Sequence, residues 1–424
     1  MDHKILNNGT IFYKNILFKQ NGDYLNRTLE FIDNKVNLTK DDKKFNILRA
    51  VIHITNTCNF ACKYCYASGG NYGEKDSIMD KETAIKIISL LNNNYPDIKV
   101  VHFFGGEPLL NLDILEFFCS KLKNKKFTLI TNGSIFNDKI SKIIKKYKID
   151  ITISLDGPKI INDANRVYKS GKGTYSIVTE NIKRFQKETM QPKSIEGAIT
   201  NETLRQISLI ELYKWILQEF NIQLVHFPYV SVSSNYDKRI NYKVYTENYL
   251  NLVDFIFLNL ISENKNKIIV DYFIVGLISG IVLKSKLPSI CPAGSSTISF
   301  SSKGDIYPCF MLNEKKEFKL SSLEEFDNKS FTENRKKFAK GLDKSLVLSG
   351  NTNWYLPSLQ YCAAAIYEDQ KTFIPPKEEL KFFELVFEKV LNYITSIREK
   401  EYEYKNLVNN LRYINKTYRD LQYK

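Results

Sequence analysis

Short apolar runs alternate with longer amphipathic segments from residue 49 to about residue 230, and this alternation restricts the fold more than any other feature. Predicted strands cover residues 51–55, 100–104, 127–130, 151–155, 195–200 and 223–230. Predicted helices cover 79–94, with Asp80 as the expected N-cap, and 111–123, 137–147, 175–188 and 202–219. Strands that alternate with helices pair in parallel through right-handed crossovers. We therefore predict an α/β fold, a partial (β/α)6 TIM-like barrel, over residues 49–287.

Unusual residues follow the predicted strands rather than precede them. The five segments are a cysteine run at 58–65, Gly-Gly-Glu-Pro at 105–108, Thr-Asn-Gly at 131–133, Asp-Gly-Pro at 156–158 and Thr-Asn at 200–201. In barrels of parallel strands, chemistry takes place at the carboxyl ends of the strands. The sequence therefore predicts one site at this rim, built from five loops.

The rest of the chain divides into three further regions. Residues 1–48 are predicted to form a short β-hairpin, from apolar pieces at 11–13 and 16–18, followed by a linker. Residues 288–370 are predicted to form a second cysteine-containing domain, in which Asp305–Cys309 is a short strand. Residues 371–424 form a helical tail that packs on the protein or faces a partner.

Composition and charge limit the class of protein. Hydrophobic residues make up 43% and charged residues 25%, which is usual for a globular chain. No apolar run is long enough for a bilayer, and the first residues lack a signal peptide, so we expect a cytoplasmic protein without a membrane partner. The net charge of +14 has two explanations, a biased codon usage or attraction to an acidic peptide. Nucleic acid is an unlikely partner because no basic motif is interleaved with aromatic residues.

Three of the seven cysteines lie within eight residues, at Cys58, Cys62 and Cys65. Three thiolates on one tight loop can hold three irons of a [4Fe–4S] cube and leave the fourth iron open. The alternative is zinc, which prefers four ligands. No nearby His or Cys completes such a set, because His53 lies inside a predicted strand. The spacing therefore favours an iron–sulfur cluster.

The cysteine run after the first strand, together with the Gly-Gly-Glu-Pro segment, resembles the radical SAM superfamily. That resemblance implies that the open iron binds S-adenosylmethionine, whose reductive cleavage gives a 5′-deoxyadenosyl radical that abstracts hydrogen from a substrate. The implied contacts to S-adenosylmethionine come from Gly105, Gly106, Glu107 and Pro108 at its ammonium, Ser154 and Arg166 at its carboxylate or ribose, Thr200 at its ribose, and the backbone around Tyr64 and Tyr66 at its adenine. For Arg166 a plain surface charge, and for Thr200 no role in binding, remain equally open.

A second set of cysteines sharpens the resemblance. Cys291, Gly304 and Cys309 have the spacing that opens SPASM and twitch domains, which carry auxiliary [4Fe–4S] clusters. Only Cys362 remains of the later cysteines, while Asn351, Asn353 and Ser358 stand where other ligands would fall. The resemblance therefore implies one auxiliary cluster with an open iron or a non-cysteine ligand. The alternative is three buried cysteines without a cluster, and Cys119 is expected to be a core residue.

The preferred hypothesis for the reaction is maturation of a ribosomally made precursor peptide, with formation of a cross-link such as a thioether. A sulfatase-type maturase, a radical SAM dehydrogenase of a small molecule, and an electron-transfer protein without a substrate are the alternatives. In sulfatase maturases an acidic residue typically follows the cysteine that corresponds to Cys309, whereas Phe310 stands here. Residues 1–48 look too short for a leader-binding domain, so a separate leader-binding protein is a possible partner. A flavodoxin or ferredoxin would supply the electron.

Overall fold

The fold is described here from a computed structural model, over residues 3–7, 10–13, 16–19, 45–231, 236, 239–264, 268–283, 290–343, 354–355 and 358–418. Its centre is a sheet in the order β10-β9-β8-β7-β6-β5-β4-β11-β12-β13. The six predicted strands are β4 (Arg49–Thr55), β5 (Val100–Gly105), β6 (Lys126–Thr131), β7 (Asp150–Ser154), β8 (Ser194–Glu196) and β9 (Leu224–His226). All six pair in parallel with their neighbours in chain order, which confirms the predicted α/β fold.

The sheet continues on both sides of these six strands. β10 (Val270–Asp271) pairs in parallel with β9. On the other side, β11 (Thr297–Phe300) pairs in parallel with β4, and β12 (Asp305–Tyr307) and β13 (Ser321–Ser322) follow antiparallel. The order leaves β10 and β13 at opposite edges, so the described strands form an open sheet. The second cysteine-containing region thus begins inside the same sheet as the barrel strands.

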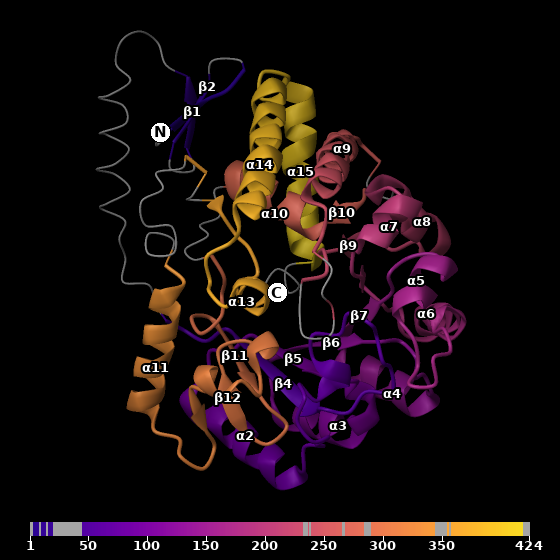
Figure 1. The fold of residues 1–424 in the computed structure, drawn as a ribbon, viewed down its shortest axis with the longest axis vertical. Helices are drawn as coiled ribbons and strands as arrows, with labels where there is room; N and C mark the ends of the chain where they lie inside the picture. The colour runs from indigo at the N-terminus through magenta and orange to yellow at the C-terminus, as the bar shows by residue number, and fades with distance from the viewer. Residues whose placement is uncertain are drawn as a thin grey trace.

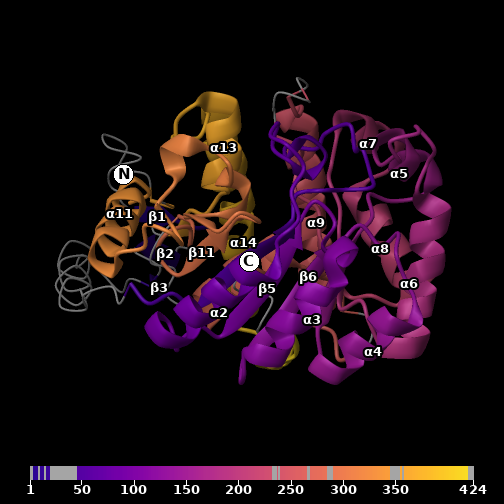
Figure 2. The same cartoon turned by 90° about the horizontal axis from the view of Figure 1, so that it is seen from below.

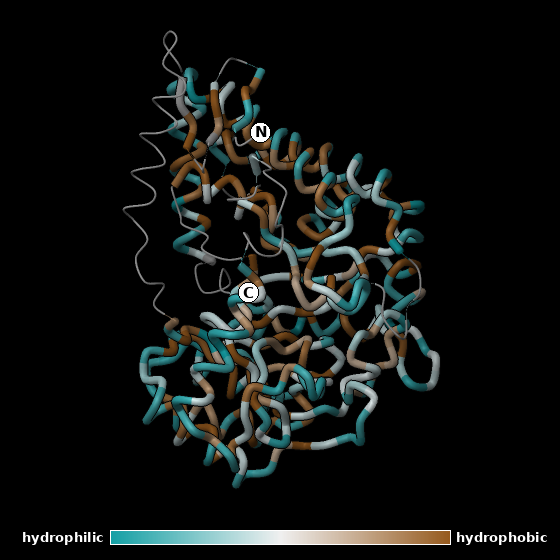
Figure 3. The backbone as a smooth tube through the Cα atoms, turned by 60° about the vertical axis from the view of Figure 1, so that its left-hand side comes forward, coloured by the Kyte–Doolittle hydropathy of each residue, from teal (hydrophilic) through white to brown (hydrophobic). Residues whose placement is uncertain are grey.

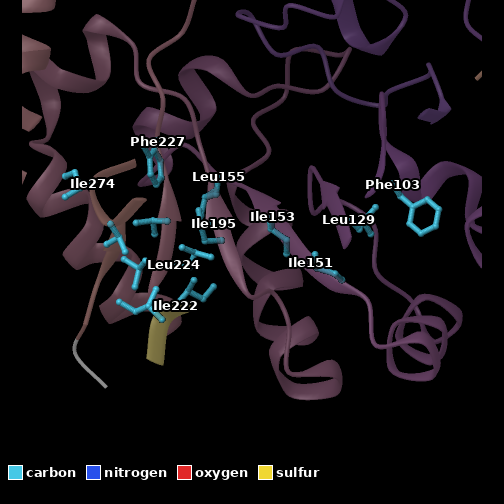
Figure 4. Close-up of a cluster of buried hydrophobic side chains, with 14 of the residues drawn as sticks. Phe103, Leu129, Ile151, Ile153, Leu155, Ile195, Ile222, Leu224, Phe227 and Ile274 are labelled. Atoms are coloured by element: carbon cyan, nitrogen blue, oxygen red, sulfur yellow. The ribbon is translucent and has the colours of Figure 1, made fainter. Parts of the chain in front are cut away.

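The two faces of the six-stranded sheet differ in chemistry. On one face Phe103, Leu129, Ile151, Ile153 and their neighbours are buried in a continuous apolar core (Figure 4). Ile52 of β4 belongs to the same core. On the other face His102 Nδ1 contacts Thr128 Oγ1 at 2.6 Å, and Thr152 Oγ1 contacts Ser194 Oγ at 2.7 Å. Fully buried parallel sheets usually carry apolar residues on both faces. The polar face therefore marks the side on which a polar guest would lie.

Helices cover the apolar face of the sheet, as Figure 2 shows for α2, α3, α4, α6 and α8. The bounds are α2 (Lys81–Asn94), α3 (Leu112–Lys121), α4 (Asp138–Tyr147), α5 (Lys159–Asn165), α6 (Tyr175–Thr189), α7 (Asn201–Gln206) and α8 (Leu209–Phe220). Asp80 caps α2 by accepting from the Thr83 N–H, as predicted. Hydrophilic and hydrophobic stretches alternate along the coiled segments of the chain, as expected for helices with one buried side (Figure 3).

One helix that was predicted to be continuous is two helices in the structure. Residues 202–219 were predicted as a single helix, whereas α7 ends at Gln206 and α8 begins at Leu209. Ser208 explains the break because its hydroxyl accepts from the Glu211 N–H, while the Glu211 carboxylate accepts from the Ser208 N–H. Such a reciprocal cap starts a new helix and turns the chain.

Two further helices were not predicted from the sequence. They are α9 (Tyr242–Leu260), which follows β9, and α10 (Tyr272–Val282), which follows β10. The predicted tail contains α14 (Lys377–Ile397) and α15 (Glu401–Tyr418), which lie side by side next to α9 (Figure 1). Tyr393 donates to Asp254 on α9 at 2.6 Å, and Phe382 stacks near Tyr245. The tail therefore packs on the protein. No helix in the described part of the chain is both long and apolar enough to cross a membrane.

At the N-terminus, β1 (His3–Ile5), β2 (Thr10–Tyr13) and β3 (Ile16–Lys19) form a separate antiparallel sheet. The predicted hairpin is present as β2 and β3, and β1 extends it. Phe12 anchors the sheet, since its ring lies edge-on to Phe387 of α14 and to Trp354. The predicted linker falls mostly outside the described residues.

Candidate functional site

The cysteine run lies in the loop that leaves β4, and its three half-buried cysteines form no disulfide. Backbone N–H groups point at two of the sulfurs, with Phe60 N 3.4 Å from Cys58 Sγ and Gly69 N 3.3 Å from Cys65 Sγ. The Asn132 side-chain amide approaches Cys58 Sγ at 3.8 Å. Hydrogen bonds to the sulfur ligands are one of the means by which a protein tunes an iron–sulfur cluster.

The electrostatics of this loop suit sulfurs that bind a cation. Burial, and then the charge of Glu107, raises the pKa of Cys58 to about 12. Burial likewise raises the pKa of Cys62 to about 11. Thiolates at this site therefore need a positive centre beside them, which iron would supply. In the described residues no three His, Cys, Asp or Glu side chains lie close enough to hold one metal ion.

Two glycines let the next strand end lie directly against the cysteine loop. A Cβ at Gly106 would lie 2.3 Å from the Thr57 carbonyl oxygen, and one at Gly105 would lie 2.0 Å from the Thr55 carbonyl oxygen. Gly105 also has a φ of +137°, which side chains with a Cβ rarely adopt. The Gly106 N–H donates to Thr55 O, and the Glu107 N–H donates to Thr57 O. The glycine pair therefore joins the ends of β4 and β5.

Glu107 is fully buried, and its carboxylate holds three strand-end groups together. Oε1 accepts from the Leu109 N–H at 3.0 Å and from the Thr131 hydroxyl at 2.7 Å, while Oε2 accepts from the Asn132 N–H at 2.7 Å. A carboxylate has about four acceptor positions, so one on Oε2 is left for a further donor such as an ammonium group. Burial raises the pKa of Glu107 despite these hydrogen bonds.

Asn132 joins the same cluster from the end of β6. Its Nδ2 donates to Asn59 Oδ1 at 2.8 Å, and its Oδ1 accepts from the Ser134 hydroxyl at 2.6 Å. The sequence marked its Thr-Asn-Gly segment as part of the rim but gave this side chain no role. The structure adds it as a residue that orients the loop at Cys58.

Tyr64, between the second and third cysteines, reaches across to the end of β7. Its hydroxyl lies 2.6–2.7 Å from both carboxylate oxygens of Asp156. Arg166 Nη1 donates to the same hydroxyl at 3.0 Å and lies 3.8 Å from Asp156 Oδ1. Arg166 is only 9% exposed, so it is not a plain surface charge. Pairing of Tyr64 with Asp156 had no signal in the sequence, because the two residues are far apart along the chain.

The remaining predicted contacts lie at the same rim. Ser154 is the last residue of β7 and pairs in register with Glu196 of β8. Thr200 caps α7, where its hydroxyl accepts from the Thr203 N–H at 3.1 Å. Pro108 begins the short turn after Glu107 and is buried. Tyr66 lies edge-on to Tyr72. The pKa of Tyr66 is raised, mainly by burial and secondly by the neighbouring Tyr72 hydroxyl.

Cys291, Cys309 and Cys362 also come together. Burial and the neighbouring sulfurs of Cys291 and Cys362 raise the pKa of Cys309. Cys362 Sγ lies 3.5 Å from the Met311 thioether sulfur. Cys362 is also the N-cap residue of α13 (Ala363–Gln370). None of these three cysteines forms a disulfide. By contrast Cys119 is buried in the core on α3, as expected. Of the positions where further ligands were sought, Ser358 is buried, and Asn351 and Asn353 lie outside the described residues.

Aromatic residues connect the two cysteine sets. The Tyr72 hydroxyl, from the loop after Cys65, donates to the carbonyl of Phe310 at 2.8 Å. The Phe310 ring packs on Phe104 of β5 with centroids 4.6 Å apart. Neither contact was predicted. They fix the loop after Cys309 against the cysteine loop after β4, so the two sets of thiols share one side of the sheet.

Residues 52–211 match the radical SAM superfamily. A cysteine-type anaerobic sulfatase-maturating enzyme of Clostridium perfringens is 28% identical over 300 residues, which are 66% of this chain and 78% of that enzyme. An uncharacterized protein of Methanocaldococcus jannaschii is 34% identical over 197 residues, and the match spans 43% of this chain and only 60% of that relative.

Solved structures show the same fold. Native anSMEcpe with bound AdoMet and Kp18Cys peptide superposes with a TM-score of 0.66 at 22% identity, covering 81% of this chain and 98% of the other. SuiB of Streptococcus suis bound to precursor peptide SuiA superposes with a TM-score of 0.52 at 17% identity, covering 82% of each chain. Residues 52–211, which hold the cysteine loop after β4 and the Gly-Gly-Glu-Pro segment after β5, are therefore a radical SAM domain.

Proposed function

We propose that this protein is a radical SAM maturase that modifies a peptide and carries one auxiliary iron–sulfur cluster. The observation that carries the proposal is the pairing of two cysteine trios on one side of the sheet. The first trio, at Cys58, Cys62 and Cys65, would hold the [4Fe–4S] cluster that binds S-adenosylmethionine. The second, at Cys291, Cys309 and Cys362, would hold an auxiliary [4Fe–4S] cluster.

When bound, the first cluster supplies the electron that cleaves S-adenosylmethionine to a 5′-deoxyadenosyl radical. The residues around it have separate tasks in the proposal. The remaining acceptor position of Glu107 receives the ammonium group of S-adenosylmethionine, while Arg166 offers positive charge to its carboxylate. Asn132 and Tyr64 hold the cysteine loop at the ends of β6 and β7. Ser154 and Thr200 line the ribose side, and the backbone near Tyr66 meets the adenine.

A peptide is favoured as substrate because of what the similar proteins bind. The anSMEcpe structure holds a peptide, and SuiB is bound to its precursor peptide. An auxiliary cluster with only three cysteine ligands leaves one iron free, and a cysteine thiolate of a peptide is a suitable soft ligand for it. We therefore favour formation of a cross-link such as a thioether on a precursor peptide.

A sulfatase-type maturase is the second candidate, since the Clostridium perfringens enzyme matches this chain over 78% of its own length. The residue after Cys309 argues against it. Phe310 packs its ring against Phe104 at 4.6 Å, so this position offers an aromatic contact in place of the acidic residue expected of a sulfatase maturase. A phenyl side chain cannot take up a proton.

The experiment is anaerobic reconstitution with iron and sulfide, followed by counting of iron and detection of 5′-deoxyadenosine after addition of dithionite and S-adenosylmethionine. We expect about eight irons per chain, given four per cube, falling to about four in the Cys58/Cys62/Cys65→Ala variant and in the Cys291/Cys309/Cys362→Ala variant. Only the second variant should still release 5′-deoxyadenosine.

Cys119→Ala is the matched control, because Cys119 is a core cysteine and should leave the iron count unchanged. An absence of 5′-deoxyadenosine from the wild type would exclude the radical reaction. About four irons in the wild type, all lost with the first trio, would exclude the auxiliary cluster. Incubation with peptides encoded beside the gene and with a cysteine peptide from a sulfatase then separates the two candidate substrates by mass spectrometry.

A further inference from the structure

A cleft of about 390 Å³ lies beyond the carboxyl end of β9, apart from both cysteine trios. Its walls come from the segment after β9, the start of α9, helix α13 and the start of α14, and include Tyr229, Arg239, Tyr242, Asp369 and Glu378. Its size is that of a site for a small molecule or a side chain. Nothing described so far uses it.

Behind the cleft wall, two tyrosines converge on one buried carboxylate. The Tyr229 hydroxyl lies 2.6 Å from Glu379 Oε2, and the Tyr242 hydroxyl lies 2.8 Å from the same oxygen and 3.1 Å from the other hydroxyl. Glu379 is 8% exposed and stands in the first turn of α14. The three side chains form a compact hydrogen-bonded trio, which we call the Glu379 trio.

The hydrogen bonds of this trio decide what the cleft can bind. A phenol has one hydrogen to donate and further lone pairs to accept with. The Tyr229 hydroxyl donates to the Glu379 carboxylate, and the Tyr242 hydroxyl donates to the same carboxylate or to the Tyr229 oxygen, so both hydroxyl hydrogens lie inside the trio. The phenol oxygens of Tyr229 and Tyr242 therefore present only acceptors to the cleft, so a guest must supply hydrogen-bond donors.

Charge points to a donor that is also a cation. Glu379 makes no ion pair within the described part of the chain, and burial raises its pKa. Asp369 and Glu378 add two carboxylates to the wall. Lys243 and Arg239 also line the cleft, but Arg239 is paired with Asp369 at 2.9 Å and is 64% exposed. Because the Arg239 side chain is mostly exposed, it can exchange this partner for water or another anion. The two phenol rings, 5.7 Å apart, supply faces that attract a cation.

The position of the cleft links it to the site. Its wall includes Ala365 and Ile366 of α13, the helix that begins directly after Cys362. On the other side, Asn201, beside Thr200 at the end of the β8 segment, donates to the carbonyl of Arg239. A peptide chain held near Cys362 could therefore place a neighbouring side chain in the cleft.

We propose that this cleft is a subsite for a lysine or arginine side chain of the substrate peptide, held by the phenol oxygens of Tyr229 and Tyr242 and by the carboxylate of Glu379 behind them. The proposal rests on the proposed function, because it assigns the basic side chain to a peptide substrate. It makes the cleft a determinant of specificity, and the chain selects peptides with a basic residue near the modified position.

The test measures binding of short peptides to the reconstituted protein by isothermal titration calorimetry. The probes are acetyl-Gly-Lys-Gly-amide, acetyl-Gly-Arg-Gly-amide and the norleucine peptide acetyl-Gly-Nle-Gly-amide, which matches lysine in length but lacks its charge. We expect the two basic peptides to bind the wild type at least about tenfold tighter than the norleucine peptide, a difference of about 1.4 kcal/mol. Glu379→Gln should remove most of this preference, and Tyr242→Phe should reduce it.

Glu388→Gln is the matched control, because Glu388 lies on the same helix and pairs with Lys4 at 2.9 Å, outside the cleft. It should leave the preference unchanged. Equal binding of all three peptides to the wild type would overturn the proposal, as would an undiminished preference in Glu379→Gln. If Glu379→Gln does not fold, an undiminished preference in Tyr242→Phe overturns it instead. The assay involves no cleavage of S-adenosylmethionine, so its result is independent of the 5′-deoxyadenosine experiment.

Discussion

At the scale of single residues, Gly106 illustrates how closely the strand ends approach one another. A Cβ at this position would overlap the Thr57 carbonyl oxygen at 2.3 Å, and backbone atoms cannot rotate away as a side chain can. We predict that Gly106→Ala lowers the free energy of unfolding by about 3 kcal/mol. Gly276→Ala is the control, since a Cβ there meets nothing within 4 Å in helix α10, and it should be neutral or stabilising. Urea unfolding of the two variants checks both expectations, and equal stability of the two would contradict the predicted clash.

A second prediction concerns Tyr64. Tyr64→Phe removes the hydroxyl that bridges Asp156 and Arg166, so the buried Asp156 carboxylate loses its shortest hydrogen bond. We expect a loss of about 2 kcal/mol in the free energy of unfolding, and a lower iron content after reconstitution because the cysteine loop is less well held.

Tyr168→Phe is the matched control for this prediction. Tyr168 lies edge-on to Phe60 at the same rim, and the structure gives its hydroxyl no hydrogen bond to a described residue. Unfolding curves and iron assays compare the two variants. Equal iron content and stability in both would show that the Tyr64 hydroxyl does not hold the loop.

The sequence predicts the residues of this site better than their contacts. Spacing identifies Cys58, Cys62 and Cys65, because ligands on one loop must be close in sequence. It cannot identify the partner of Tyr64, or the contact of Tyr72 with Phe310, because these pairs depend on how distant loops meet. For Thr200, the capping hydrogen bond is a role that a short motif does not distinguish from ligand binding.

At the scale of elements, hydrophobic periodicity predicted the six parallel strands in the right order but not the additions to them. β11 was missed because the prediction for its region depended on the spacing of the cysteines and not on hydrophobic periodicity. α9 and α10 were missed because their apolar residues surround much of the helix, so no single apolar stripe identifies them. The break at Ser208 was missed because the apolar pattern continues across it, while the cap is a local polar signal.

Helix α11 (Asn328–Gly341) supports the loop after Cys291 through one side chain. Arg335 is 2% exposed and donates to the carbonyls of Gly294, Ser295 and Phe45. We predict that Arg335→Met lowers the free energy of unfolding by about 3 kcal/mol, because one buried and two partly buried carbonyls lose their donor. Cys291 in the metal-free protein should also react faster with a thiol reagent.

The control for this element is Lys336→Met, which changes an exposed residue on the same helix. It should alter neither the unfolding curve nor the rate of thiol modification. An Arg335→Met variant with wild-type stability and thiol reactivity would show that the loop is held by other contacts.

At the scale of the whole molecule, four buried carboxyl groups share one electrostatic property. Burial raises the pKa of Glu107, Asp156, Asp271 and Glu379 in the folded protein. A raised carboxyl pKa means that the native state binds protons more tightly than the unfolded chain. The stabilisation is therefore fully present below the ordinary pKa, 3.8 for Asp and 4.5 for Glu, and is lost as pH rises through the folded value.

Asp271 provides the test of this property. Its Oδ1 caps α10 by accepting from the Ile274 N–H, and its Oδ2 accepts from the Tyr213 hydroxyl. In Asn the amide oxygen can keep the cap, while the amide NH2 can donate to the Tyr213 oxygen instead. We predict that the stability advantage of the wild type over Asp271→Asn shrinks as pH rises above 3.8. Urea unfolding of both proteins at several pH values measures the difference. An advantage that grows with pH would mean that the native pKa of Asp271 is lowered.

The pairing of β11 with β4 has a consequence for how the chain is made. β4 receives β5 on one side soon after synthesis, but its other side waits for residues 297–300, more than two hundred positions later. Until then the nascent protein exposes an unpaired strand edge, the kind of surface that invites pairing with another chain. A ribosome-bound chain that stops before residue 297 should therefore need protection by chaperones, and that need should end once β11 has emerged.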